Sequence, residues 1–410
     1  MGNILNIINS DDHFYNLNKE CKVQYIKLFE GPFISKEVRN HFKFTIVNID
    51  SIDKNKKYIY PIECRQIDAI YSGIHHIPQE VVELVNQDRC KVIFSYESEG
   101  DFPIEDFNDI FYKSKFILRE KVKLSNIYIF CNDFMAHERN NTELNFFGSA
   151  HFLDTISYQL NEMIDDKSFG VELSDFDYSF KIRDINEIDI ENKSKRFLCY
   201  LRNCARPHRI GIASYFEHNN LWYDNNISFL KVTYNNETCH FLPSHLESAQ
   251  NKLKTKNIIE LDTQHLETKT GFETIFSSDW KHYQETFLSI VSETCFDNKS
   301  IYFSEKTIKP LLHMHPFIMM STQHTLLKLK ELGFKTFHPF INESYDDEHQ
   351  TKARFDMILY ELGKFREKSY EELKDWWRNI LPILKHNQKR LLELGRQKTD
   401  KIKLLERIND

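Results

Sequence analysis

Polar residues in the second half of the chain follow apolar segments in a pattern suited to binding a diphosphate. Basic residues follow the apolar segment 196–201, and a polar triplet follows the segment 287–291. A third group opens an expected helix near residue 304, and two of its lysines are three positions apart, so they share one helical face. Ligands of open α/β sheets bind beyond the carboxyl ends of the strands, so we expect the three groups to meet in one crevice. The candidate residues are Arg202, Arg206, His208, Arg209, Ser292, Glu293, Thr294, Ser304, Glu305, Lys306 and Lys309.

Several cations beside a helix N-terminus stabilise a diphosphate, and Glu305 is placed to accept hydrogen bonds from ribose hydroxyls. The chain has 11 glycines among its 410 residues, and neither G-x-G-x-x-G nor G-x-x-x-x-G-K-[ST] occurs. Side chains and helix N-termini, rather than a glycine-rich loop, are therefore expected to hold any phosphate. The alternative is that these charges form surface salt bridges.

Alternating strand-like and helix-like segments are expected to position these residues. The expected strands are 44–49, 91–96, 127–130, 196–201, 287–291 and 316–320, and the expected helices begin at Pro78, near 110, at 206, at Ser304 and at Leu326. This alternation predicts an α/β fold with two Rossmann-like domains. A polar, acidic stretch at 165–194 marks the boundary between them. We therefore predict domains at 1–190 and 191–345, followed by helices over 346–410.

The C-terminal tail has apolar residues at helical spacing, including Leu373, Trp376, Trp377, Ile380 and Leu384. Pro382 is expected to break or kink this helix, because proline lacks the N–H that the helix needs. The pattern predicts an amphipathic helical pair that packs on the core. A coiled coil that forms a homodimer is the alternative.

The composition narrows the class of protein. Aromatic residues make up 14% of the chain, which argues against disorder, and no apolar run is long enough to span a membrane. The eight cysteines contain no C-x-x-C pair, so we expect reduced thiols in a cytoplasmic protein. The histidines show no zinc-ligand spacing, and we expect neither a metal nor a cofactor. A net charge of −7 disfavours nonspecific nucleic-acid binding.

Five segments of the second half resemble the nucleotide-sugar domain of the alpha-1,3-fucosyltransferases and of related phage and bacterial glycosyltransferases. They are Ser292-Glu293-Thr294, the "S-E-K-T-I-K-P" at 304–310, the "P-F-I" at 316–318, the segment 329–337, and the stretch 196–209 with its "F-L-x-x-x-R…R-x-x-R". The resemblance departs at Ser321, where the family often has glycine. It implies a glycosyltransferase-B fold in which two Rossmann-like domains face a central cleft. In that fold residues 1–190 bind the acceptor and 191–345 the nucleotide sugar, with Lys306 and an arginine of 202–209 on the diphosphate and Glu305 on the ribose.

The resemblance also implies an inverting, metal-independent transfer from a nucleoside-diphosphate sugar to an acceptor hydroxyl. Lys306, Lys309, Arg206 and Arg209 would stabilise the charge that grows on the departing diphosphate. The transfer also needs a base for the acceptor hydroxyl, and the candidates are Glu99, then Glu97, after the strand 91–96. His75 and His76 are further base candidates.

Two alternatives to this function remain open from the sequence. Asp175 and Asp177 form the D-x-D of a metal-dependent glycosyltransferase, although they lie in an acidic stretch rather than after an apolar strand. The second alternative is that the chain is a non-catalytic scaffold or binding module. The acceptor is expected to be a glycan, or a hydroxymethylated DNA base if the basic segment 119–123 contacts DNA, in a bacterium or a phage-infected host cell.

Overall fold

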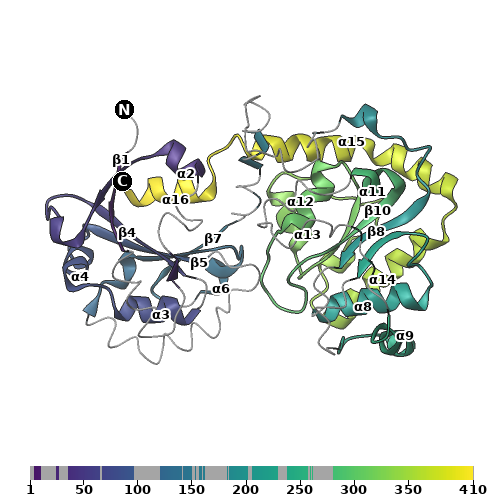
Figure 1. The fold of residues 1–410 in the computed structure, drawn as a ribbon, viewed down its shortest axis with the longest axis horizontal. Helices are drawn as coiled ribbons and strands as arrows, with labels where there is room; N and C mark the ends of the chain where they lie inside the picture. The colour runs from purple at the N-terminus through teal and green to yellow at the C-terminus, as the bar shows by residue number, and fades with distance from the viewer. Residues whose placement is uncertain are drawn as a thin grey trace. The chain divides into compact units, whose positions relative to one another are not determined.

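The structure is a computed structural model, and the described part of the chain falls into two compact units (Figure 1). Unit 1 comprises Met1–Tyr158 and Gln397–Asp410, and unit 2 comprises Gln159–Arg396. The described residues are 4–10, 25–26, 36–64, 67–96, 121–140, 142–149, 153, 157–158, 160–161, 182, 184–201, 206–229, 238–256, 259, 261 and 280–409.

Unit 1 is built on a sheet in which the described strands have the order β3-β1-β4-β5-β6-β7, all parallel, with β2 antiparallel to β4. The strands are β1 (Ile4–Ile8), β2 (Tyr25–Ile26), β3 (Lys43–Val47), β4 (Tyr58–Cys64), β5 (Cys90–Tyr96), β6 (Ile127–Cys131) and β7 (Asn145–Gly148). The expected strands at 44–49, 91–96 and 127–130 are confirmed within a few residues. Strands β5 and β6 are almost entirely buried, as their apolar sequences predict.

Strand β4 was not predicted, because Pro61 lies in its middle and proline cannot donate to a strand ladder. It nevertheless pairs along its whole length with β5, while its pairing with β1 is limited to Ile7 and Ile59. The hydroxyl of Ser10 donates to the Pro61 carbonyl at 2.7 Å. The Ser10 side chain thus adds a hydrogen bond to β4 on the side that faces β1, where the pairing between the two strands is short.

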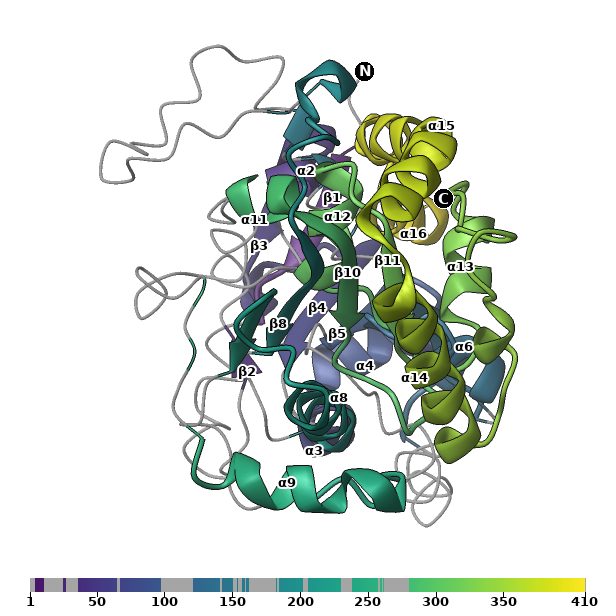
Figure 2. The same ribbon diagram turned by 90° about the vertical axis from the view of Figure 1, so that its right-hand side faces the viewer.

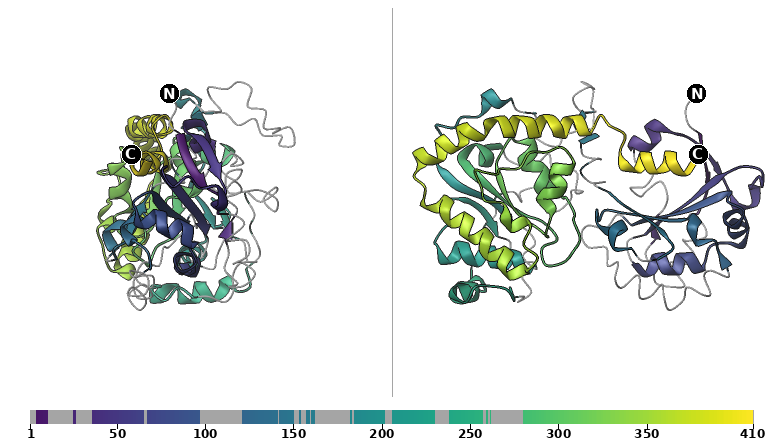
Figure 3. Two further views of the ribbon diagram at one scale, coloured as in Figure 1. Left: turned by 90° about the vertical axis from the view of Figure 1, so that its left-hand side faces the viewer. Right: turned by 180° about the vertical axis from the view of Figure 1, so that it is seen from behind.

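Helices cover both faces of the unit 1 sheet. One face packs against α3 (Ile67–His75) and α4 (Gln79–Asn86), through a core that includes Ile70, Val81 and Phe94. The other packs against α2 (Lys36–His41) and α16 (Asp400–Asn409), which Figure 3 shows side by side beneath the N-terminus. The short helix α6 (Ala136–Arg139) precedes β7. The last helix of the chain therefore belongs to unit 1, whereas the sequence analysis placed all of 346–410 in one extension.

Unit 2 is built on a four-stranded parallel sheet in the described part of the chain, with the order β11-β10-β8-β9. The strands are β8 (Lys195–Leu201), β9 (Asn226–Phe229), β10 (Thr286–Ser292) and β11 (Phe317–Met320). The chain leaves β8 toward β9 and leaves β10 toward β11, so the two connections lead away from the β8/β10 pair in opposite directions. That pair is the switch point of a doubly wound sheet, where such sheets bind ligands.

Helices also cover both faces of the unit 2 sheet. The described helices are α8 (Pro207–His218), α9 (Glu247–Leu253), α11 (Trp280–Glu285), α12 (Glu305–Leu312), α13 (Thr325–Glu331), α14 (Thr351–Glu367) and α15 (Tyr370–Leu394). Figure 2 shows α12 near α15, and α8 near α14 and α9. Gly211 of α8 lies against the Phe355 ring of α14, with room for no larger side chain.

Helix α15 runs through Pro382 without a break, and a kink at this residue stays a prediction. Its apolar residues are buried inside unit 2, and the Trp377 indole donates to the Phe287 carbonyl at 2.7 Å. Packing within the chain holds the helix where proline alone would interrupt it. The apolar face of α15 is thus buried within the chain.

The α/β class with two Rossmann-like units is confirmed. Among the described residues, no helix combines the length and the apolar character needed to cross a bilayer.

Candidate functional site

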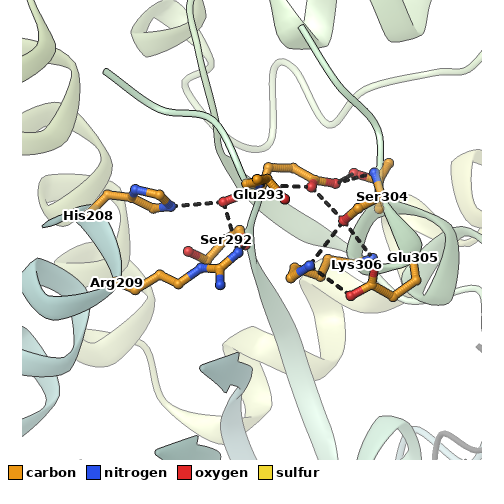
Figure 4. A network of polar contacts seen from close by, with 9 residues as sticks. His208, Arg209, Ser292, Glu293, Ser304, Glu305 and Lys306 are labelled. Carbon is orange, nitrogen blue, oxygen red and sulfur yellow. Dashed lines mark hydrogen bonds and ion pairs between the residues drawn. The ribbon is translucent and has the colours of Figure 1, made fainter. Parts of the chain in front are cut away.

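The candidate site lies at the carboxyl end of β10, at the switch point of unit 2 (Figure 4). Ser292 ends β10, and Glu293, which follows it, is completely buried. The backbone N–H of Glu293 donates to the Met320 carbonyl at 3.0 Å, which extends the ladder with β11 by one hydrogen bond. The side chains of Ser292 and Glu293 are therefore held by the hydrogen-bonded strands at the carboxyl end of the sheet.

Helix α12 begins at this edge, and Ser304 is its N-cap as the sequence predicted. The Ser304 hydroxyl accepts the Lys306 backbone N–H at 3.3 Å and donates to a Glu293 carboxylate oxygen at 2.6 Å. The other carboxylate oxygen of Glu293 accepts the Ser304 backbone N–H at 3.0 Å and the Thr307 hydroxyl. Strand β10 and the first turn of α12 are thus joined by a buried carboxylate.

Lys306 and Glu305 form an ion pair in the first turn of α12. The ammonium lies 2.7 Å from a Glu305 carboxylate oxygen and 3.2 Å from the Ser304 hydroxyl, and both charged side chains are about one-fifth exposed. Burial opposes ionisation of Glu305, but the charge and hydrogen bond of Lys306, helped by Lys309, outweigh it and lower the pKa from 4.5 to about 2. Glu305 is therefore a carboxylate at neutral pH, and the Lys306 ammonium faces it.

Helix α8, which follows β8 in the chain, begins at the same carboxyl end of the sheet. The Arg209 guanidinium donates to the carbonyls of Ser292 and Glu293, each at 3.2 Å. The His208 ring contacts the Glu293 carbonyl through Nε2 at 2.9 Å and stacks on Phe296. Burial and the charge of Arg209 lower the pKa of His208 well below 6.5, so the ring is neutral at pH 7. A carbonyl only accepts, so Nε2 carries the ring proton.

The remaining cations of the predicted set lie around this centre. Arg206 is the exposed N-cap residue of α8, and its charge helps to lower the pKa of His208. Lys309 is buried one turn further along α12, with its ammonium 5.3 Å from the centre of the Tyr200 ring. Arg206, Arg209 and Lys306 thus lie at the beginnings of two helices, while Lys309 lies in the last turn of α12.

Ser292 supplies a feature that the sequence did not indicate. Its side chain is 1% exposed, and the hydroxyl has no hydrogen-bond partner among the described residues. A buried hydroxyl without a partner costs free energy unless a ligand or water satisfies it. Thr307 contacts the same carboxylate but was not among the predicted candidates. A capping box has Glu or Gln at this position, so no local rule marks a threonine there.

Several predicted residues lie outside the described part of the chain. They are Glu97, Glu99, Arg202, Asp175 and Asp177, so the base and the D-x-D hypotheses stay predictions. His75 ends α3, and the Lys121 ammonium donates to its backbone carbonyl. Lys121 precedes β6, so His75 lies near the amino ends of the strands, and this location does not favour it as a base.

No protein family matches the chain, and no curated protein matches it. Among solved structures, it is similar to one titled "Structure of Candida albicans trehalose-6-phosphate phosphatase N-terminal domain". The two chains are 9% identical with a TM-score of 0.41, over 100% of this chain and 96% of the other. A similarity at this TM-score carries no argument about the fold or the function.

Proposed function

We propose that the protein is a glycosyltransferase of the B type that moves a sugar from a nucleoside-diphosphate sugar to an acceptor hydroxyl without a metal ion. The observation that carries the proposal is the meeting of two helix N-termini, α8 and α12, at the β8/β10 switch point, with Arg206, Arg209 and Lys306 beside them. Helix N-termini and cations together bind phosphate oxygens. The Ser292 hydroxyl supplies a further polar group that the described residues do not satisfy.

In the proposed reaction, the bond between the sugar and the diphosphate breaks, and negative charge grows on the leaving oxygen. The partly buried Lys306 and the exposed Arg206 offset this charge. Glu305 accepts hydrogen bonds from the ribose hydroxyls. The acceptor hydroxyl loses its proton to a base, for which Glu99 and then Glu97 stay the candidates.

One observation favours a second function, a nucleotide-binding module that does not catalyse transfer. The carboxylate of Glu293 accepts from Ser304, and the Ser304 hydroxyl in turn accepts from Lys306, so both groups are engaged within the protein rather than turned to a ligand. A binding module predicts tight nucleotide binding and no release of sugar. The two functions therefore differ in turnover rather than in affinity.

Calorimetric titration with nucleoside diphosphates in the presence of a chelator tests the proposal. We expect Lys306→Ala to weaken binding by ten- to a hundredfold, since a hydrogen bond from a charged group contributes about 1.5–3 kcal/mol. Lys328→Ala is the matched control, because Lys328 is similarly buried and pairs with Glu331 on α13. Turnover is measured as nucleoside diphosphate released from a panel of nucleotide sugars. Equal affinities of Lys306→Ala and the native protein would contradict the proposed site.

A further inference from the structure

We propose that Glu293 is a positioning residue that holds the first turn of α12 and the first turn of α8 in place for the diphosphate. The carboxylate does not itself contact the ligand. The ligand in this inference rests on the proposed function, whereas the structural role of Glu293 does not.

The carboxylate of Glu293 orients the Ser304 hydroxyl. A hydroxyl has one proton to donate, and Ser304 gives it to Glu293 at 2.6 Å. The lone pairs of the same hydroxyl are then left to accept from the backbone N–H and the ammonium of Lys306, at 3.3 and 3.2 Å. The buried carboxylate therefore determines, through one hydroxyl, where Lys306 points.

The same residue also organises α8 through its backbone. The Glu293 carbonyl accepts from His208 Nε2 at 2.9 Å and from the Arg209 guanidinium at 3.2 Å. These two residues lie in the first turn of α8, directly after the N-cap Arg206. Glu293 thus contacts both helices whose N-termini form the candidate site.

A carboxylate suits this position better than an amide. Four donors converge on its two oxygens: the backbone N–H groups of Thr294 and Ser304 and the hydroxyls of Ser304 and Thr307. The negative charge also lies at the N-terminus of α12, where the helix dipole stabilises it. The amide of Glu293→Gln would turn an N–H₂ group toward one of these donors. The Ser304 hydroxyl would then lose its fixed orientation.

Hydrogen exchange and nucleotide titration of Glu293→Gln test the inference. We expect faster exchange of the amides of residues 304–308 and about tenfold weaker binding of nucleoside diphosphates. In a Lys306→Ala background, we expect Glu293→Gln to weaken binding less than about twofold, because its effect passes through Lys306. A role confined to stability would instead give the same fold-change in both backgrounds.

Glu343→Gln is the matched control. Glu343 is also a buried carboxylate that accepts a threonine hydroxyl, from Thr336 at 2.5 Å, and a backbone N–H, from Phe337 at 2.6 Å. Phe337 packs on Phe317 at the amino end of β11, away from the site. This variant should lose stability as Glu293→Gln does and keep its nucleotide affinity.

The outcomes separate the inference from the proposed function. If Glu293→Gln does not fold, Thr307→Val takes its place, since it removes one donor to the carboxylate at nearly constant volume. If the native protein binds no nucleotide, the proposed function fails, and faster exchange at 304–308 in the variant still supports the positioning role. Unchanged exchange at 304–308, or equal fold-changes in both backgrounds, would overturn the inference.

Discussion

Replacing Glu305 by Gln is expected to tighten the binding of inorganic pyrophosphate. In the structure the Glu305 carboxylate lies 2.7 Å from the Lys306 ammonium, which is the cation that the proposed diphosphate would use. A diphosphate must therefore compete with Glu305 for Lys306. Removing the negative charge of Glu305 also removes its repulsion of the ligand.

The lowered pKa of Glu305 sets the size of this effect. The fall from 4.5 to about 2 corresponds to about 3 kcal/mol of interaction with the charged form. Lys306 is the largest of the causes that favour the charged form. A hydrogen bond between charged groups contributes about 1.5 kcal/mol at the low end, and we take that amount for the competition. That amount corresponds to about a tenfold change in Kd.

Isothermal titration of pyrophosphate and of a nucleoside diphosphate measures the effect. Glu305→Gln should bind pyrophosphate about tenfold more tightly. The gain should be smaller for the nucleoside diphosphate, because an amide is a poorer acceptor for the ribose hydroxyls. Glu331→Gln is the control, since it removes the same charge from the ion pair with Lys328 on α13.

Pyrophosphate affinity that is unchanged or weaker in Glu305→Gln would refute this reasoning. Equal tightening in Glu331→Gln would also count against it, because the effect would then come from net charge rather than from Lys306.

Two further predictions concern stability. The pKa of Glu305 is lower in the folded chain, so its contribution to the free energy of unfolding is complete above about pH 4.5 and is lost as the pH falls through about 2. Between pH 5 and pH 2.5, the free energy of unfolding measured with urea should therefore fall less in Glu305→Gln than in the native protein. Leu405 is buried between α16 and the unit 1 sheet, so Leu405→Ala should destabilise unit 1 by about 2–5 kcal/mol. Hydrogen exchange should then rise in β1 and β4 while β10 keeps its protection, and a uniform rise in both units would contradict the assignment of α16 to unit 1.

Local sequence signals predicted the elements that carry the site. The apolar runs of β8, β10 and β11 and the N-cap Ser304 were recognisable because each depends on neighbouring residues alone. The meeting of Arg209, Glu293 and Lys306 followed from the rule that ligands bind beyond the carboxyl ends of parallel strands.

Features that depend on distant contacts were not predictable. Strand β4 is stabilised by its full pairing with β5 despite Pro61, and the burial of α15 overrides Pro382. The assignment of α16 to unit 1 depends on contacts with Val38 and Phe42, which are more than 350 residues away in the sequence. The role of Thr307 also required the position of Glu293, because a helix start alone does not show what its side chains contact.

Hydrogen exchange in the presence of a nucleoside diphosphate tests the central claim most directly, because it reports the two helix N-termini separately. The account predicts that a saturating ligand slows exchange in the segments 206–210 and 304–309 together. Protection of one segment without the other, or protection confined to other parts of the chain, would contradict a diphosphate site at the β8/β10 switch point.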